Sequence, residues 1–173
     1  LMTIHSSKGL EFPIVFLIDA DHGFNNSDTK GRYVLDRDAG MGITVKDFVH
    51  RLEVDTMQKN WIIDVRQRKM LAEELRVLYV ALTRAQQKLI ITGALKAATP
   101  TLEKWAQASD TGELLLPEAE RGKAKNFLDW IGMAIMRVPS VTEDYPEVSS
   151  RKLDSVAGVE VKLKVVNRAD LLA

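Results

Sequence analysis

Cysteine is absent from the 173-residue sequence, which excludes disulfide bonds, thiolate metal sites and cysteine nucleophiles. No run approaches the roughly twenty apolar residues of a membrane span, and the start lacks the basic-then-apolar order of a signal peptide. With 24 basic and 24 acidic residues, the net charge is zero, so no global field attracts the chain to nucleic acid or to a membrane. These absences predict a cytoplasmic protein whose contacts with nucleic acid must be local.

Apolar residues make up 46% of the chain, enough for one hydrophobic core or for part of a larger domain. Residues 1–5 and 13–19 are continuous, β-branched apolar runs of the kind found in parallel strands buried on both faces. A helical pattern extends over residues 55–84, and residues 89–92 then predict another buried strand. This order predicts an α/β sheet. Because the chain opens inside an apolar run with no preceding cap, we expect a fragment of a longer protein.

The long helical pattern has apolar residues at alternating steps of three and four, which predicts one buried face: Trp61, Val65, Ala72, Leu75, Tyr79 and Leu82. Between Ala20 and Met41 the sequence is polar and rich in turn formers, so we expect a surface excursion with a short strand at Tyr33 to Leu35. The later segments predict helices at 101–108 and 123–136, a linker at 139–150 and a half-exposed strand at 159–166.

A polar turn, His5-Ser6-Ser7-Lys8-Gly9-Leu10-Glu11, separates the first two apolar runs. Ligand sites of α/β proteins lie at the carboxyl ends of parallel strands, so this position favours a functional turn. Gly9 allows close approach of the backbone to a ligand, Lys8 could meet a phosphate and Glu11 could accept a hydrogen bond from a hydroxyl. The turn is not a P-loop, because G-x-x-x-x-G-K-[ST] occurs nowhere in the chain. From the residues alone, a structural pair of Lys8 and Glu11 is an equally good explanation.

The second candidate is Arg84, at the end of the long helical pattern in EELRVLYVALTRA. A basic residue in the last turn of a helix is stabilised by the helix macrodipole, so Arg84 could simply cap the helix. An arginine that projects from a rigid helix end beside strand termini also has the geometry needed to clamp a γ-phosphate. The spacing alone does not decide between these two roles.

The two stretches together resemble a known family. MTIHSSKGLEFPIVFL resembles motif V, and EELRVLYVALTRAQQKLIITG resembles motif VI, of superfamily-one helicases of the UvrD/PcrA/RecB group. LYVALTRA, Phe24-Asn25, the YVLD at 33–36 and the AKNFLDWIG at 124–132 are most similar to the AddA/RexA family of helicase/nuclease subunits within that group. The motif-level resemblance covers about residues 1–95, and a weaker one extends to about 137.

The resemblance implies an α/β fold: part of a second RecA-like (P-loop NTPase-like) motor domain, with a mostly parallel sheet flanked by helices and a helical extension. We expect residues 1–98 to be the C-terminal part of that domain, 99–138 the helical extension, and 139–173 a linker with a terminal strand. The family departs from this sequence at Ser6, where its members often have lysine, which weakens any basic contact there.

By the same resemblance, Arg84 acts as the arginine finger on the γ-phosphate of ATP, and Glu11 binds the ribose. Lys8 and Gly9 shape that nucleotide contact, while Thr3 and His5 touch the backbone of single-stranded DNA. The implied cofactors are ATP and Mg²⁺, with the metal ligands supplied by segments absent from this fragment. The implied partners are single- and double-stranded DNA and an AddB/RexB-like subunit, in double-strand-break repair and recombination.

Two alternatives remain open. The parent could be a UvrD/PcrA-type repair helicase without a nuclease, or a motor-like domain that has lost catalysis and serves as a DNA-binding or assembly module. In each case the fragment alone is expected to be inactive, because the Walker A lysine, the Walker B acidic pair and a nuclease centre are missing from it.

Other patterns predict no functional site. His5, His22 and His50 are scattered, and no H-E-x-x-H spacing occurs, so we expect no metal site. The DADHG and DRDAG runs lack the glycine and glutamate of a calcium-binding loop and are predicted to be turns. The three tryptophans lie in helical patterns, which favours core packing over base stacking.

Overall fold

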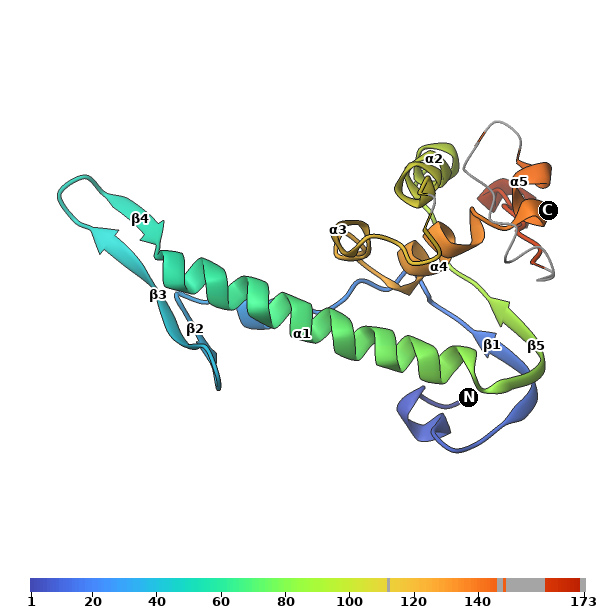
Figure 1. Cartoon of the computed structure of the whole chain (residues 1–173), viewed down its shortest axis with the longest axis horizontal. Coiled ribbons are helices and arrows are strands. Elements are labelled where there is room, and N and C mark those ends of the chain that lie inside the picture. The colour runs from blue at the N-terminus through green and yellow to red at the C-terminus, as the bar shows by residue number, and fades with distance from the viewer. Residues whose placement is uncertain (112, 146–147, 149–160, 172–173) are drawn as a thin grey trace. The chain divides into compact units, whose positions relative to one another are not determined.

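The structure is a computed structural model that describes residues 1–111, 113–145, 148 and 161–171. The chain forms two compact units: residues 1–15 with 24–90, and residues 16–23 with 91–173. The elements, shown in chain order in Figure 1, are η1 (His5–Ser7), β1 (Phe12–Leu17), η2 (Ser27–Thr29), β2 (Tyr33–Asp36), β3 (Gly40–Asp47), β4 (Leu52–Asp55), α1 (Met57–Leu82), β5 (Ala85–Ile91), α2 (Ala98–Ser109), α3 (Glu118–Arg121), α4 (Phe127–Ile135), α5 (Pro139–Asp144) and η4 (Arg168–Leu171).

Strands β1 and β5 form a two-stranded sheet, in which they lie side by side (Figure 1). The amide of Phe12 donates to the carbonyl of Arg84 at 2.9 Å, and the amide of Thr92 donates to the carbonyl of Leu17 at 2.9 Å. The partners advance together along both strands, so the pair is parallel. This confirms the predicted α/β class with a parallel sheet and helices.

The prediction that the apolar strands are buried on both faces is wrong for β1. Ile14 and Phe16 are exposed, as is Ile18 just after the strand. A two-stranded sheet has no central strand, and burial on both faces requires layers that these residues do not have above and below them. The apolar sequence of β1 suits a more enclosed position than this chain provides.

The strand predicted at residues 1–5 is also wrong. The residues before the turn form η1, because the hydroxyls around it bond to the local backbone in place of a strand partner. The Oγ of Ser7 donates to the carbonyl of Ile4 at 2.7 Å, and its amide bonds to the carbonyls of Thr3 and Ile4. The Oγ1 of Thr3 accepts from the amide of Ser6 at 3.3 Å. The buried Ser7 therefore anchors a compact turn that leads into β1.

The predicted excursion contains a three-stranded antiparallel sheet, β2-β3-β4, of which the sequence indicated only the β2 strand. In its register Tyr33 pairs with Ile43, and Val45 pairs with Val54. One face packs on α1, and Gly42 is needed there because a Cβ would lie 2.3 Å from the Cα of Lys59. We call the sheet with its turns the meander.

The opposite face of the meander, here the open face, consists of apolar side chains. Cross-strand partners in a ladder lie on the same face, and alternate residues of a strand share it. The members of the open face are between 43% and 66% exposed: Tyr33, Leu35, Met41, Ile43, Val45, Leu52 and Val54. The meander is therefore apolar toward solvent, while its packed face includes the polar residues Thr44 and Asp55.

Helix α1 confirms the predicted long helix, with one difference in its buried face. It begins after Thr56, whose Oγ1 accepts from the amide of Lys59 at 3.2 Å as an N-cap. Ile62, Leu78 and Ala81 are its buried apolar residues. Of the predicted buried stripe, Trp61, Ala72, Tyr79 and Leu82 are exposed, so that prediction is wrong at these positions. The partner layer for their side of the helix is not among the described residues.

The second unit is built around α2 and α4, which confirm the two predicted helices. The side chain of Trp105 in α2 is 3% exposed, and its Nε1 donates to the carboxylate of Asp129 in α4 at 2.9 Å. Gly132 allows α4 to approach, because a Cβ there would lie 2.3 Å from the Trp105 ring. Trp130 and Met133 complete this core. Core packing is confirmed for Trp105 and Trp130, but not for the exposed Trp61.

The loop after β1 is bonded into this second unit. The carbonyl of Ala20 accepts from the amide of Leu128 at 2.8 Å, and the carbonyl of Asp21 accepts from the Nδ2 of Asn126 at 3.2 Å. The carboxylate of Asp21 also accepts from the amide of Ala94 at 2.9 Å. The start of α4 is thereby held on the loop that follows β1.

The C-terminal predictions are partly wrong. Residues 139–144 of the expected linker form α5, with Pro139 at the first helical position, where its missing amide is tolerated. Residues 161–166 of the expected strand lie in neither helix nor strand, and residues 159 and 160 are outside the described residues. Within the described part of the chain, no helix is long and apolar enough to cross a membrane.

Candidate functional site

The turn between η1 and β1 depends on the backbone conformation of Gly9. Its φ is +83°, in the left-handed region that residues with a Cβ rarely adopt. No neighbouring atom lies within 4 Å of the place where a Cβ would be, so conformation, and not lack of space, requires glycine. The amide of Leu10 donates to the carbonyl of Ser7 at 3.0 Å and closes the turn. Gly9 therefore presents open backbone at the start of β1.

Arg84 lies two residues after the last residue of α1, and three of its N–H groups donate hydrogen bonds within the chain. Its Nε donates to the carbonyl of Val80 at 2.9 Å, and its Nη2 donates to the Oγ1 of Thr83 at 2.9 Å. Its Nη1 donates to the carbonyl of Leu10 at 2.9 Å. The guanidinium is therefore fixed between the end of the helix and the polar turn.

The structure brings Arg84 and Glu11 to the same end of the β1-β5 pair. The carbonyl that accepts from Arg84 belongs to Leu10, the neighbour of Glu11 in the chain. The exposed carboxylate of Glu11 accepts from the Nε2 of Gln86, two residues after Arg84, at 3.1 Å. Among the described residues, no carboxylate forms an ion pair with Arg84, so its charge is available to an anion. The alternative of a structural Lys8–Glu11 pair finds no such pair here, because the partner found for Glu11 is Gln86.

The other predicted site residues lie on the surface next to this end. Lys8 and His5 are exposed, and the amide of Lys8 donates to the carbonyl of His5 at 3.3 Å. Thr3 is exposed too, and its hydroxyl is hydrogen-bonded to that of Ser6 at 2.9 Å. Lys8 thus lies within the turn that contains Gly9, whereas Thr3 lies just before η1 and His5 lies within it.

Sequence reasoning missed Thr83. Its Oγ1 accepts from Arg84 and donates to the carbonyl of Tyr79 at 2.8 Å. A threonine directly before the last basic residue of a helix was the available signal, because its hydroxyl can bond back to a carbonyl four residues earlier. The sequence does not reveal that the same oxygen would meet the guanidinium.

A second group that sequence reasoning missed lies inside the meander. The ammonium of Lys59 is almost buried and donates to Thr44 at 2.7 Å and to Asp55 at 2.8 Å. Thr44 also donates to the carboxylate of Asp55 at 2.6 Å. The hydrogen bond from Lys59, followed by that from Thr44, lowers the pKa of Asp55. The three groups satisfy one another, which indicates that they join β3 and β4 to α1.

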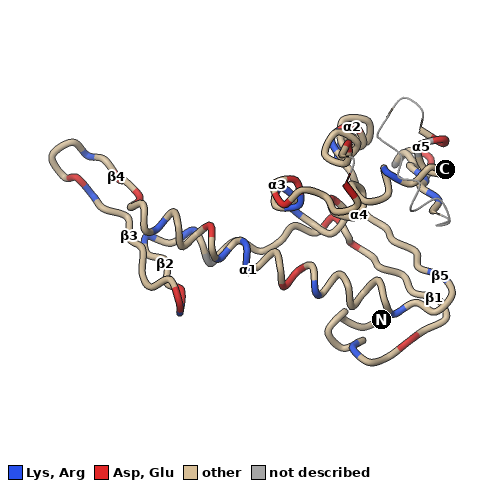
Figure 2. The backbone as a smooth tube through the Cα atoms, viewed as in Figure 1, with Lys and Arg blue, Asp and Glu red and all other residues tan. Residues whose placement is uncertain are grey.

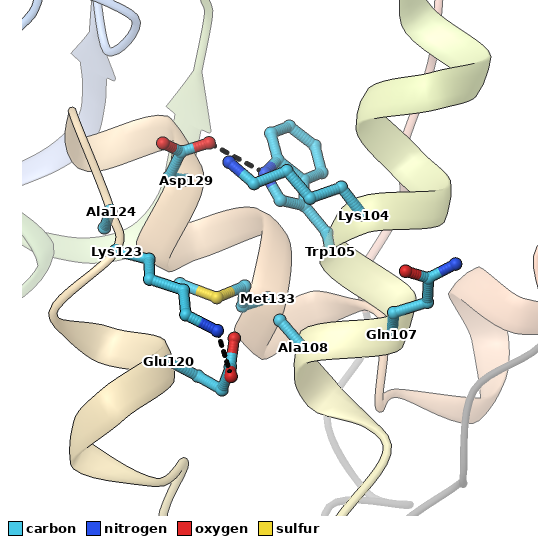
Figure 3. A pocket seen from close by; sticks show the side chains of 9 residues that line it. All are labelled: Lys104, Trp105, Gln107, Ala108, Glu120, Lys123, Ala124, Asp129 and Met133. Carbon is cyan, nitrogen blue, oxygen red and sulfur yellow. Dashed lines mark hydrogen bonds and ion pairs between the residues drawn. The ribbon is translucent and has the colours of Figure 1, made fainter.

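Figure 3 shows a pocket of about 280 Å³ in the second unit, lined by residues of α2, α3 and α4 and of the segment between α3 and α4. Its charged groups are bonded to neighbours, Lys123 to Glu120 at 2.6 Å and Asp129 to Trp105 at 2.9 Å. Asp129 also accepts from the amide of Lys125 at 2.9 Å. These bonds give the polar lining a structural role in joining the three helices.

Charge is spread along the chain. Figure 2 shows basic and acidic residues interleaved along α1, where Arg68 pairs with Asp64 at 3.2 Å and Arg76 pairs with Glu73. The described residues contain no group of three or more histidine, aspartate or glutamate side chains that could hold a metal ion. A nucleic-acid contact of this chain would therefore depend on a few local groups.

Comparison with known proteins gives a consistent result. The model of the UvrD-like helicase C-terminal domain family matches residues 1–96. The chain is 68% identical, over 99% of its length, to the AddA subunit of the ATP-dependent helicase/nuclease of Pediococcus pentosaceus, and covers 14% of that protein. It is 42% identical over 95% of its length to the protein of the same name from Ligilactobacillus salivarius, and covers 13% of it. The corresponding protein of Listeria monocytogenes is 38% identical over 95% of the chain.

The chain therefore spans only about 14% of the length of such relatives. The family match includes the polar turn with Gly9 and Glu11, and it includes Arg84 at the end of α1. Because that match covers more than half of the 173 residues, the chain belongs to the UvrD-like helicase C-terminal domain family.

Proposed function

We propose that the protein containing this chain is an ATP-dependent DNA helicase and exonuclease subunit that couples ATP hydrolysis to movement along DNA in double-strand-break repair and recombination. Residues 1–98 would be the C-terminal part of its second RecA-like motor domain, 99–138 a helical extension and 139–173 a linker. The relatives with the same sequence pattern are named as helicase/nuclease subunits, which supports this function. Work on chromosomal DNA would place the protein in the cytoplasm.

The main support comes from the position of Arg84 next to the polar turn. Its guanidinium donates to the carbonyl of Leu10, so it lies at the strand end that also has Glu11 and the open backbone of Gly9. A guanidinium has five N–H groups, and the three bonds described above leave two for a phosphate. The absence of a described carboxylate partner leaves its positive charge uncompensated. This arrangement suits an arginine that stabilises charge on a transferring phosphoryl group.

The residues present fit one side of a nucleotide. An exposed carboxylate, Glu11, can accept from a ribose hydroxyl, and Lys8 can meet phosphate oxygens near the turn. ATP would supply the phosphoryl group whose transfer to water releases free energy. Mg²⁺ would be held by segments outside these residues, because the described residues have no cluster of ligands for it. The roles of this chain are to bind the ribose, to orient Arg84 and to complete the site.

Contact with DNA is proposed for Thr3 and His5. Both are exposed and lie close in sequence to Gly9, so the same segment can touch the nucleotide and single-stranded DNA. Closure of the site around ATP would move this segment, and reopening after hydrolysis would move it back. Single- and double-stranded DNA are the proposed partners, together with a second subunit of the AddB/RexB type.

Two alternative functions differ from this proposal in defined ways. A UvrD/PcrA-type repair helicase would have the same Arg84 and Glu11 but no nuclease, and the names of the relatives favour the helicase/nuclease. A silent DNA-binding or assembly module would not need a charged group at Arg84. The uncompensated guanidinium next to Glu11 therefore favours an active motor.

The decisive experiment replaces Arg84 in the full-length parent. We expect Arg84→Ala to reduce DNA-stimulated ATP hydrolysis by on the order of 10³-fold or more, because an arginine finger contributes about that much. Arg68→Ala, an exposed arginine of the same helix that pairs with Asp64, is the matched control and should keep the parental rate. Parental hydrolysis by Arg84→Ala would exclude the proposed role and favour the silent module.

A further inference from the structure

The hydroxyl of Thr83 has a defined direction. Thr83 ends α1 as its C-cap, and its Oγ1 lies 2.8 Å from the carbonyl of Tyr79 and 3.2 Å from that of Val80. A hydroxyl has one proton, and these carbonyls can only accept, so the proton points back into the helix. The lone pairs of the oxygen are thereby turned away from the helix carbonyls.

Arg84 uses this oxygen as an acceptor. Its Nη2 donates to the Oγ1 of Thr83 at 2.9 Å, while its Nε and Nη1 donate to the carbonyls of Val80 and Leu10. Three acceptors in different directions fix both the position and the plane of a rigid guanidinium. Two of them are backbone groups, which side-chain substitution does not remove. Within the described residues, Thr83 is the one side-chain acceptor for Arg84.

We propose that Thr83 is a positioning residue for Arg84, and that its hydroxyl holds the guanidinium in the plane from which it reaches the phosphate of the nucleotide. This inference rests on the proposed function of Arg84. Loss of orientation lowers the rate of the chemical step, because a misplaced group stabilises the transition state less while binding of the ground state changes little. Thr83 acts through Arg84 and has no contact of its own with the reaction.

A purely structural role for Thr83 predicts something different. A threonine hydroxyl in a helix commonly bonds to the carbonyl four residues earlier, and such a bond affects helix stability. Thr101 in α2 makes the same bond, from its Oγ1 to the carbonyl of Ala97 at 2.7 Å, and is therefore the matched control. A structural role would change the melting temperature, and it would not depend on the residue at position 84.

The test measures DNA-stimulated ATP hydrolysis by the full-length parent. We expect Thr83→Val, which keeps the shape but removes the hydroxyl, to lower kcat by about 10- to 100-fold with KM for ATP changed less than about threefold. Thr83→Ser keeps the hydroxyl and should restore kcat to within about threefold. Thr101→Val should leave both constants unchanged. Thr83→Ala is the second variant should Thr83→Val fail to fold.

A double substitution separates the two explanations. Arg84→Lys keeps the positive charge but has no Nη2 to donate to Thr83, so Thr83→Val should cause no further loss of kcat in that background. Parental kcat in Thr83→Val, no rescue by Thr83→Ser, or an equal loss in the Arg84→Lys background would each overturn the inference. Failure of the proposed function is distinct, because it would appear as parental hydrolysis by Arg84→Ala itself.

Discussion

Gly9 shows how a single residue can shape the site without any side chain. Its φ of +83° requires a residue without a Cβ, and the open space around it shows that a methyl group would meet no neighbour. The effect of a substitution should therefore come from backbone strain alone. Strain of this kind costs on the order of 1 kcal/mol.

We expect Gly9→Ala to destabilise the chain by about 1 kcal/mol in urea unfolding, because alanine adopts a positive φ only with strain. Gly23→Ala is the control: Gly23 has no positive φ, and a Cβ there would lie 3.9 Å from the nearest atom, the carbonyl oxygen of Lys125. This control should be neutral or slightly stabilising, since alanine has less conformational freedom in the unfolded chain. Equal unfolding midpoints for the two variants would contradict the role given to the turn.

Single residues of the site could largely be located from the sequence. Arg84, Glu11 and Gly9 were found because strand ends, helix ends and glycine turns limit where ligand groups can lie. The bond partners could not be predicted. Whether the guanidinium would meet Leu10 and Thr83, or a carboxylate, depends on side-chain rotamers and on the η1 turn, and neither is determined by spacing.

Among the elements, the meander differs most from expectation. The sequence between β1 and α1 has many turn formers, which concealed strands as short as four residues. The helices α1, α2 and α4 were predicted, because a period of 3.6 remains visible over nine or more residues. The buried face of α1 was assigned incorrectly, because apolar periodicity does not show whether a packing partner exists.

The open face of the meander should make the isolated chain self-associate. Exposed apolar strands pair readily with other molecules, and a charge on the exposed face opposes this. We expect Ile43→Lys to stay monomeric in sedimentation at protein concentrations at which the parental chain associates. Gln87→Lys adds the same charge on exposed β5 and should not have this effect. A monomeric parental chain at all concentrations would contradict the prediction.

The end of β2 provides a prediction about pH. The backbone amides of Ala39 and Asp38, and then the ammonium of Lys69, hold the pKa of Asp36 down to about 2 from 3.8. A lowered folded-state pKa stabilises the fold above the unfolded value and loses that contribution as pH falls toward the folded value. The urea midpoint should therefore decrease between about pH 4 and pH 2.

Asp36→Asn should flatten this pH dependence, because the amide has no carboxylate to protonate. Asp64→Asn on α1 is the control, and it should leave the slope of the parental chain in place. The same steep decrease in both variants would show that other carboxylates cause the acid sensitivity. The measurement is the midpoint of urea unfolding at intervals of pH.

At the scale of the whole molecule, the chain belongs to a much larger machine. It spans about 14% of the length of its helicase/nuclease relatives, and its parallel sheet has two strands with exposed apolar residues in β1. The family could be identified from motifs V and VI. The extent of uncovered surface could not, because apolar sequence does not reveal which molecule or segment covers it.

We expect the isolated chain to show no ATP hydrolysis above background, with or without single-stranded DNA. The chain has no G-x-x-x-x-G-K-[ST] sequence, and its described residues offer no metal-binding cluster. A coupled assay for ADP release tests this, with the full-length parent as the positive control. DNA-stimulated hydrolysis that Arg84→Ala abolishes would show that these residues form a complete site.

Helix α1 gives the first unit a mechanical property. Its 26 residues extend about 39 Å at 1.5 Å per residue, with the meander at one end and Arg84 just beyond the other (Figure 1). A rigid rod of that length that tilts by about 3° about one end displaces the other by about 2 Å. An adjustment of the guanidinium too small to break a hydrogen bond would thus become a stroke of useful size at the far tip, and the rod works as a lever.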